Sequence, residues 1–406
     1  MRSQDGQGLK YYYHSTQRTA SFLTVACVLC FVVYSLYIIL GEQRDIVALT
    51  HYITSGGDTL DSIFISALLS TLLAALPSVL LLSFFTFPIR LKAVATLPSF
   101  VILGILTGSW MQNIQDSDIH LPLLSGSIMM TVAIALCLAS LSIRENHAEH
   151  NTVSYYLCSN VVILSLGMLM SIIVSNHNRE LHDQLLVERL MQQGDTQQAL
   201  DVATDYTVQN RNITAMHALA LSREGRLADE LFSQPGLKGS ESLIPDTAPA
   251  CRIYLAPCIV ARHIRATIVS GARMSTARFL EKAVEMRQQA MADTLRMKQD
   301  SLSIQPLADY YLCSLLLDRK LSKFVKMLPQ FYAISDSMPR HYREAYILAQ
   351  RRHINDGTVL EDEEITTAIT DFIQIMSRNA RDTSQQRKAC LDMYDGTYWS
   401  YYFLKR

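Results

Sequence analysis

The sequence YYLCSNVVILSLGMLMSIIV, residues 155–174, decides the fold of this chain. It carries no charged side chain, and about 20 apolar residues are what an α-helix needs to cross the ~30 Å hydrocarbon core of a bilayer. Four similar stretches precede it, at residues 21–40, 62–87, 93–110 and 121–143. It is therefore the last of five predicted spans, which together form a predicted transmembrane domain over residues 21–175.

The composition of the whole chain agrees with this division. Of the 406 residues, 49% are hydrophobic and only 18% are charged, whereas soluble domains carry about 25% charged residues. The apolar excess lies in the first 175 residues, and the remainder has an ordinary soluble composition. The formal net charge of −1 gives no sign of a nucleic-acid partner. The sequence predicts the lipid bilayer as a partner and no cofactor.

The distribution of lysine and arginine predicts the orientation in the membrane. Short cytoplasmic loops are enriched in these residues. One set of loops holds six of them and the opposite set holds only Arg44; the six are Arg2, Lys10, Arg18, Arg90, Lys92 and Arg144. Residues 1–20 are thus predicted to be a cytoplasmic tail. Because five crossings are an odd number, residues 184–406 are predicted to lie outside the cytoplasmic (inner) membrane, in the periplasm or the extracellular space.

Two segments of the soluble half share a pattern, LMQQGDTQQAL at residues 190–200 and LSREGRLADEL at residues 221–231. They resemble the middle of a tetratricopeptide repeat, where one helix ends at a glycine turn and a second begins. A looser copy lies at residues 315–328, with Arg319 in the glycine position. The resemblance implies helical hairpins that stack side by side. It assigns the packing positions to Leu186, Leu190, Gly194, Ala199, Leu221 and Gly225.

The overall plan resembles that of uncharacterised bacterial polytopic membrane proteins with a tetratricopeptide-like C-terminal domain. The resemblance implies an all-α fold, with a five-helix transmembrane bundle followed by a hairpin-repeat domain over residues 184–406. An aromatic cluster closes the chain, from Tyr394 to Phe403. We expect it to cover the exposed core of the last repeat, although a binding tail and an element that docks on the bilayer are alternatives.

Few residues in the sequence suggest a metal site or a disulfide. His147 and His150, beside Glu145 and Glu149, have a spacing that suits a metal ion, but a solvated turn between two spans is the favoured interpretation. Cys251 and Cys258 would form a small disulfide loop if the soluble half lies in an oxidising compartment. With Cys313 and Cys390 there are three possible pairings, and buried free thiols are the competing interpretation.

The predicted spans contain no Asp, Glu, Lys, Arg or His away from their ends. Pumps and intramembrane enzymes place such groups at membrane depth. The preferred hypothesis is therefore a non-enzymatic, membrane-anchored scaffold whose helical repeats bind a protein or peptide. The alternatives are an enzyme or accessory subunit of the membrane interface, in envelope polysaccharide or lipid assembly, and a channel or transporter.

Overall fold

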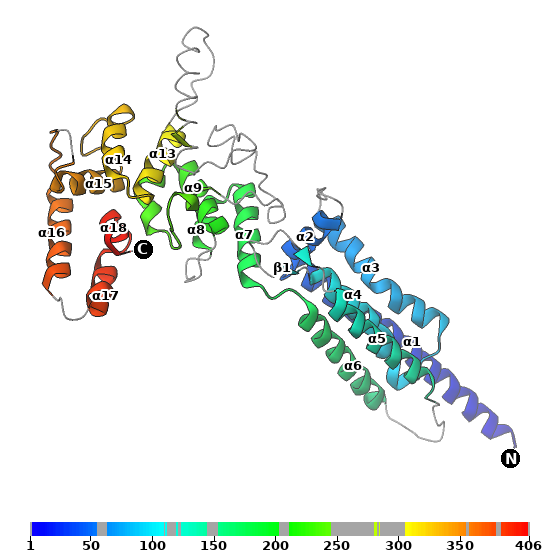
Figure 1. Ribbon diagram of the computed structural model, residues 1–406. Helices are drawn as coiled ribbons and strands as arrows, with labels where there is room; N and C mark the ends of the chain where they lie inside the picture. Colours follow the sequence, from blue (N-terminus) through cyan, green and yellow to red (C-terminus); the bar gives the residue numbers. More distant parts are fainter. Residues whose placement is uncertain are drawn as a thin grey trace, which may run out of the picture. The chain divides into compact units, whose positions relative to one another are not determined.

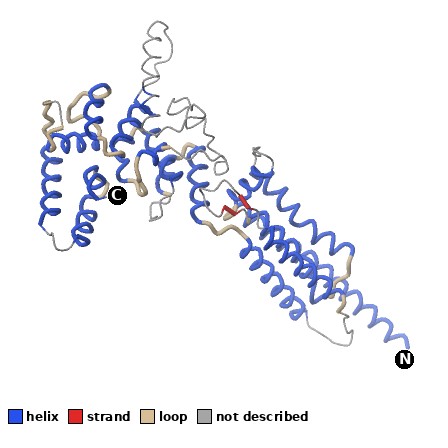
Figure 2. The backbone as a smooth tube through the Cα atoms, in the orientation of Figure 1, coloured by secondary structure: helices blue, strands red, loops and turns tan. Residues whose placement is uncertain are grey.

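The computed structural model describes residues 2–54, 63–108, 110–111, 119–120, 123–143, 153–202, 211–244, 280–281, 284, 305–354, 357–378 and 383–404. These residues are almost wholly helical and form two compact units that divide between His182 and Asp183 (Figures 1 and 2). We name them the N-terminal unit and the C-terminal unit. The division falls between the end of the predicted transmembrane domain at residue 175 and the start of the predicted helical domain at residue 184.

The N-terminal unit consists of helices of very different length. Its elements are α1 (Arg2–Leu40), α2 (Arg44–Thr54), α3 (Ile63–Phe84), the 3₁₀-helix η1 (Ile89–Thr96), α4 (Leu97–Thr107), α5 (Leu123–Leu141) and α6 (Val153–Val174). Two short strands, β1 (Trp110–Met111) and β2 (Ile119–His120), pair antiparallel. Helix α1 continues back to Arg2, through residues that the sequence assigns to a tail, because no proline interrupts the helix there.

Within the described residues, four helices are long and apolar enough to cross a membrane: Arg18–Leu40, Phe64–Phe84, Ile89–Thr107 and Val153–Val174. They correspond to the first, second, third and fifth predicted spans. The fourth predicted span is helix α5, whose apolar part, Ser125–Leu141, is shorter. The structure is thus compatible with a multi-pass membrane protein.

The N-terminal unit exposes the side chains that a soluble domain buries. Among the described residues, all but four of the exposed large apolar side chains lie between Phe22 and Ile173. Its interior holds apolar clusters and also buried polar side chains, among them Ser35, Ser99 and Asn160. An apolar surface of this extent is expected against lipid and not against water.

Hydrogen bonds and close contacts define the helix directions in this unit. The Cys137 thiol lies 3.4 Å from the Val94 carbonyl oxygen, and Gly126 packs against Ile105, so α5 runs antiparallel to η1 and α4. Helix α6 runs parallel to them, because the Ala93 N–H donates to Asn160 at 2.7 Å and Gly104 packs against Val174. That close approach uses one of the small residues of the third predicted span.

The ends of α1, α4 and α6 meet at the same end of the bundle. The Gln43 amide, just after α1, donates to the Asn176 carbonyl oxygen at 3.1 Å. The Asn176 N–H, just after α6, donates to the Thr107 carbonyl oxygen at the end of α4 at 3.0 Å. The chain therefore leaves the bundle at the end opposite its N-terminus.

Among its described residues, the C-terminal unit contains four successive pairs of helices, which we call hairpins; the connection is short in the first three pairs and spans residues 352–362 in the fourth. Their helices are α7 (Arg179–Gln193) with α8 (Thr196–Asp201), α9 (Arg211–Glu224) with α10 (Leu227–Glu230), α13 (Gln305–Leu317) with α14 (Leu321–Met327), and α15 (Arg340–Arg351) with α16 (Glu363–Arg378). The short 3₁₀-helices η2 (Leu231–Ser233), η3 (Ser240–Leu243) and η5 (Leu328–Gln330) follow α10 and α14. Helices α17 (Thr383–Tyr394) and α18 (Tyr398–Leu404) come last.

The first helix of every one of these hairpins ends in the same way. A residue of positive φ follows it: Gly194 (89°), Gly225 (73°), Arg319 (57°) and His353 (55°). The next N–H then donates to the carbonyl oxygen five residues earlier, at 2.8–3.0 Å; the pairs are Asp195 with Leu190, Arg226 with Leu221, Lys320 with Leu315 and Ile354 with Ala349. This is the Schellman arrangement of a helix C-terminus. A side chain in this conformation costs about 1–2 kcal/mol compared with glycine.

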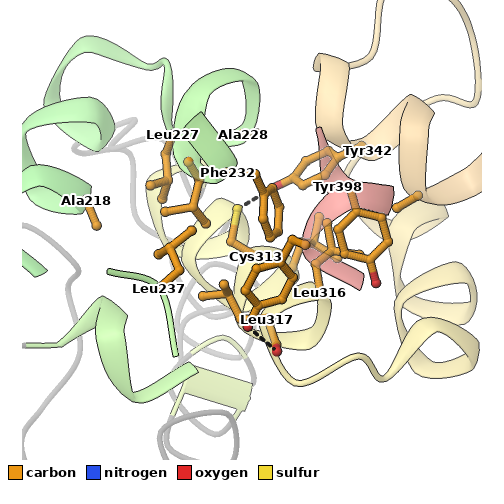
Figure 3. Packing of buried hydrophobic residues seen from close by; sticks show 14 of the residues in the cluster. Ala218, Leu227, Ala228, Phe232, Leu237, Cys313, Leu316, Leu317, Tyr342 and Tyr398 are labelled. Carbon is orange, nitrogen blue, oxygen red and sulfur yellow. Dashed lines mark hydrogen bonds between the residues drawn. The ribbon is translucent and has the colours of Figure 1, made fainter. Parts of the chain in front are cut away.

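The core of the C-terminal unit is aromatic and joins elements far apart in the sequence. Phe232 of η2 lies 5.2 Å from Tyr398 and 5.1 Å from Tyr401 between ring centroids. Figure 3 shows this region, in which Leu227 and Ala228 of α10, Cys313 of α13, Tyr342 of α15 and Tyr398 of α18 gather around Phe232.

Candidate functional site

The polar side chains inside the N-terminal bundle hold irregular backbone in place. The third span begins as a 3₁₀-helix in which Leu91 departs from helical geometry (φ −122°, ψ 18°). The Asn160 side chain accepts from the Ala93 N–H at 2.7 Å and donates to the Ile89 carbonyl oxygen at 2.9 Å. Ser159 donates to the Arg90 carbonyl oxygen at 2.8 Å. An unpaired backbone group in hydrocarbon costs several kcal/mol, so α6 stabilises the break.

A second irregularity lies in α3, which contains Pro77. Proline removes one helical hydrogen bond and distorts the turn around it. The Ser78 N–H donates to the Ser99 hydroxyl oxygen of α4 at 3.2 Å. The described spans have no Asp, Glu, Lys, Arg or His away from their ends. Asn160, Ser159 and Ser99 thus bind backbone groups of neighbouring helices, whereas the buried Ser35 and Thr71 hydroxyls have no hydrogen-bond partner among the described residues.

In the C-terminal unit, a buried carboxylate joins three elements. Glu344 and His341 of α15 are both 0% exposed, and the His341 Nδ1 lies 3.0 Å from the Glu344 carboxylate. The same carboxylate accepts from the Tyr398 N–H of α18 at 2.8 Å and from the Arg340 Nε at 2.9 Å. The Phe232 N–H lies 3.4 Å from the His341 Nε2. Glu344 therefore caps α18 and has no access to a substrate in water.

A second buried acid lies on α13. Asp309 accepts from the Tyr332 hydroxyl at 2.6 Å and from the Tyr342 hydroxyl at 3.0 Å. Burial raises the pKa of this carboxyl to about 6, against the two hydrogen bonds, which lower it. The Cys313 sulfur lies 3.7 Å from the Tyr342 hydroxyl, and burial raises the pKa of this thiol. A buried thiol of this kind is unreactive.

Helix α18 is held by side chains from several hairpins. Besides Glu344, the Arg319 guanidinium donates to the Tyr401 carbonyl oxygen at 3.3 Å, and the Arg352 guanidinium donates to the Tyr402 hydroxyl at 2.7 Å. Arg352 also lies 4.7 Å from the centre of the Tyr402 ring, a cation–π contact. The Tyr401 hydroxyl donates to the Leu317 carbonyl oxygen at 2.9 Å. We name Phe232, Leu317, Arg319, Glu344 and Arg352 the α18-binding face.

The polar atoms of α18 itself are poorly satisfied. The Tyr398 hydroxyl, the Trp399 Nε1 and the Ser400 hydroxyl are buried and find no hydrogen-bond partner among the described residues. Each such group costs about 1–3 kcal/mol. The aromatic cluster therefore packs into the core between η2, α13 and α15, and not only over the last repeat as the sequence predicts, at a cost in unpaired polar groups.

The residues that the tetratricopeptide resemblance assigns to packing lie in or beside hairpin turns. Gly194 and Gly225 occupy the positive-φ positions. Leu190, Ala199 and Leu221 are buried in the core, and Leu186 is partly buried against it.

The other predicted site residues have different outcomes. His147, His150, Cys251 and Cys258 lie outside the described residues. Cys313 and Cys390 are free and buried. Within the part of the chain that the structure describes, no group of three or more His, Cys, Asp or Glu is arranged to hold a metal ion.

Sequence reasoning does not find the α18-binding face. Its signal is present but indirect, because Arg319 occupies a glycine position and an aromatic cluster ends the chain.

These features describe a helical protein with several helices of membrane-spanning length and a separate unit of helical hairpins. The chain belongs to a family of unknown function, DUF6057, which matches residues 8–264 and 260–405. No curated protein and no solved structure matches the chain.

Proposed function

We propose that this protein is a membrane-anchored scaffold whose tetratricopeptide-like hairpins present a protein-binding or peptide-binding surface outside the cytoplasmic membrane. The observation that carries this proposal is the turn shared by the four hairpins, at Gly194, Gly225, Arg319 and His353. Repeated hairpins of this kind build an extended surface from successive units, and such surfaces bind polypeptides.

The orientation follows from five crossings. Helix α5 runs antiparallel beside η1 and α4 from Gly126 to Cys137, which supports a fourth crossing at the depth of the third. The meeting of the ends of α1, α4 and α6 supports an odd number of crossings. Lysine and arginine favour the end that carries Arg18, Arg90 and Lys92 as the cytoplasmic one. The C-terminal unit then lies outside.

The binding of several of the bundle's polar side chains to its own backbone favours an anchoring role for the spans over transport. Asn160, Ser159 and Ser99 each bind backbone atoms of a neighbouring helix. A transport pathway needs polar groups that exchange partners with a substrate.

Photo-crosslinking in the native membrane tests the scaffold. A photoreactive residue replaces Met393, an exposed side chain of the C-terminal unit (66% exposed). The matched control replaces Val162 on α6, which is 67% exposed but faces the predicted lipid. We expect a discrete protein adduct from position 393 and lipid adducts from position 162. Protein adducts from position 162 alone would contradict the proposal.

A further inference from the structure

Several elements that are separate in the sequence contact helix α18, as the residues of a binding site contact a ligand. Its contacts come from η2 after the second hairpin, from α13 of the third and from α15 of the fourth. Glu344 meets its first N–H, Arg319 meets a carbonyl oxygen, and Arg352 meets an aromatic ring and its hydroxyl. A carboxylate at a helix N-terminus and arginines over aromatic rings are general means of holding a short aromatic helix.

A glycine hinge joins this helix to the rest of the chain. Gly396, between α17 and α18, has a φ of 81°. A Cβ atom at this position would lie 2.8 Å from the Ser233 hydroxyl oxygen. Position 396 therefore favours glycine chiefly for its conformation, and a larger residue there also displaces the Ser233 hydroxyl. Such a residue opposes the docking of α18 without replacing a residue of the α18-binding face.

The docked helix is also imperfectly matched to its site. Tyr398, Trp399 and Ser400 each bury a polar atom that has no partner in the described structure. Polar groups buried without a partner favour release into water. The hydrophobic contacts of Tyr398 and Tyr401 with Phe232 oppose this release.

We infer that the α18-binding face is a peptide-binding site, and that α18 is an internal ligand that occupies it until another aromatic helical segment displaces it. The partner segment would present an unpaired helix N-terminus to Glu344 and aromatic rings to Arg319 and Arg352. This inference rests on the proposed scaffold function and specifies where the partner binds. The partner's site is thereby closed in the free protein.

The test uses the full-length protein in detergent and a dye-labelled peptide of residues 397–406 with Phe in place of Trp399. The chain has two tryptophans, so a Trp110→Phe background leaves Trp399 as a single reporter of α18. We expect saturable peptide binding by anisotropy, at about millimolar concentrations because the tethered helix competes. As the peptide binds, the quenching of Trp399 by acrylamide should rise severalfold.

Two variants separate the internal ligand from its site. Gly396→Ala raises the fraction of molecules with α18 released, so a tenfold rise in that fraction tightens the apparent peptide affinity about tenfold. Arg352→Gln removes a contact that the internal and added helices share. It weakens both, so the apparent peptide affinity should stay nearly unchanged while the quenching of Trp399 by acrylamide rises before any peptide is added. Gly194→Ala is the matched control, since Gly194 has a similar φ of 89° in a different turn and open space around it. It should leave the peptide affinity unchanged.

Two results would overturn the inference. One is peptide binding that leaves Trp399 shielded, and the other is an absence of saturable binding to both the parent protein and Gly396→Ala. If Gly396→Ala does not fold, the change in acrylamide quenching of Trp399 in the parent protein decides whether the peptide displaces α18. The peptide experiment tests only whether α18 occupies a binding site. Whether the protein is a scaffold at all is tested separately, by the crosslink at position 393.

Discussion

The two units of this protein bury polar side chains for opposite reasons. In the N-terminal unit, Asn160 and Ser99 bind backbone groups that a break and a proline kink have released. In the C-terminal unit, Glu344 and Asp309 join side chains and helix ends from separate elements. The first arrangement pairs backbone groups between helices that are apolar enough to cross a membrane, whereas the second fastens helices of the C-terminal unit to one another. We attribute the difference to the expected surroundings, lipid for the first unit and water for the second.

We expect the largest loss of folding stability when the buried carboxylate of Glu344 is removed. Glu344→Leu leaves His341 and the Tyr398 N–H without their acceptor, and breaking a buried pair costs about 3–5 kcal/mol. Urea unfolding of the Trp110→Phe background, followed by Trp399 fluorescence, measures the loss. Glu344→Gln keeps one acceptor oxygen and should lose clearly less. Equal losses would show that Glu344 does not fasten α18.

In the N-terminal unit, Asn160→Leu leaves the Ala93 N–H and the Ile89 carbonyl oxygen unpaired. Two such groups should cost about 2–4 kcal/mol. Unfolding in sodium dodecyl sulfate, followed by circular dichroism, measures the effect. Ser165→Leu on the same helix is the control, because the exposed Ser165 binds only the Val161 carbonyl oxygen of its own helix in the described structure. A similar loss in both variants would refute the role of Asn160.

Asp309 of α13 should make the folding stability of the C-terminal unit depend on pH. The pKa of Asp309 is about 6 in the folded protein and 3.8 in the reference state. The folded state therefore holds this proton more tightly, and stability falls by about 2–3 kcal/mol as the pH rises from about 4 to about 6. Asp309→Asn should remove this slope. Urea unfolding at pH 4.5 and pH 7 measures it, and an unchanged slope in the variant would contradict the assignment.

We expect the smallest change in stability at the positive-φ residue that ends the first helix of each hairpin. His353 has a φ of 55°, where glycine is favoured. His353→Gly should stabilise the C-terminal unit by about 1 kcal/mol. Gly225→Ala, at a φ of 73° in the corresponding turn, should destabilise it by about the same amount. Denaturant midpoints give both values. Changes of the same sign would show that the two turns are not equivalent.

Long-range features of the fold are readable from the sequence to different extents. Hydropathy locates the helices at residues 63–84 and 153–174 to within three residues of the predicted spans, because a bilayer demands a continuous apolar run. Gly194 and Gly225 mark their turns because each has a positive φ. His353 occupies the same conformation without a glycine, so composition conceals that turn.

The sequence does not predict the irregular backbone before α4 or the capping of α18, for a related reason. Asn160 and Glu344 act on residues 67 and 54 positions away in the chain. A single sequence has no local pattern that announces such a contact, since an asparagine in a span and a glutamate in a helix each have several ordinary roles. Only the packed structure shows which partner each one binds.

The central claim is that the chain leaves the bundle on the side opposite its N-terminus. Epitope tags at both ends, in intact cells treated with an external protease, test it directly. The account predicts that the C-terminal tag is digested while the N-terminal tag stays protected until the membrane is permeabilised. Protection of both tags, or digestion of both, would contradict it, because the two ends would then share one side of the membrane.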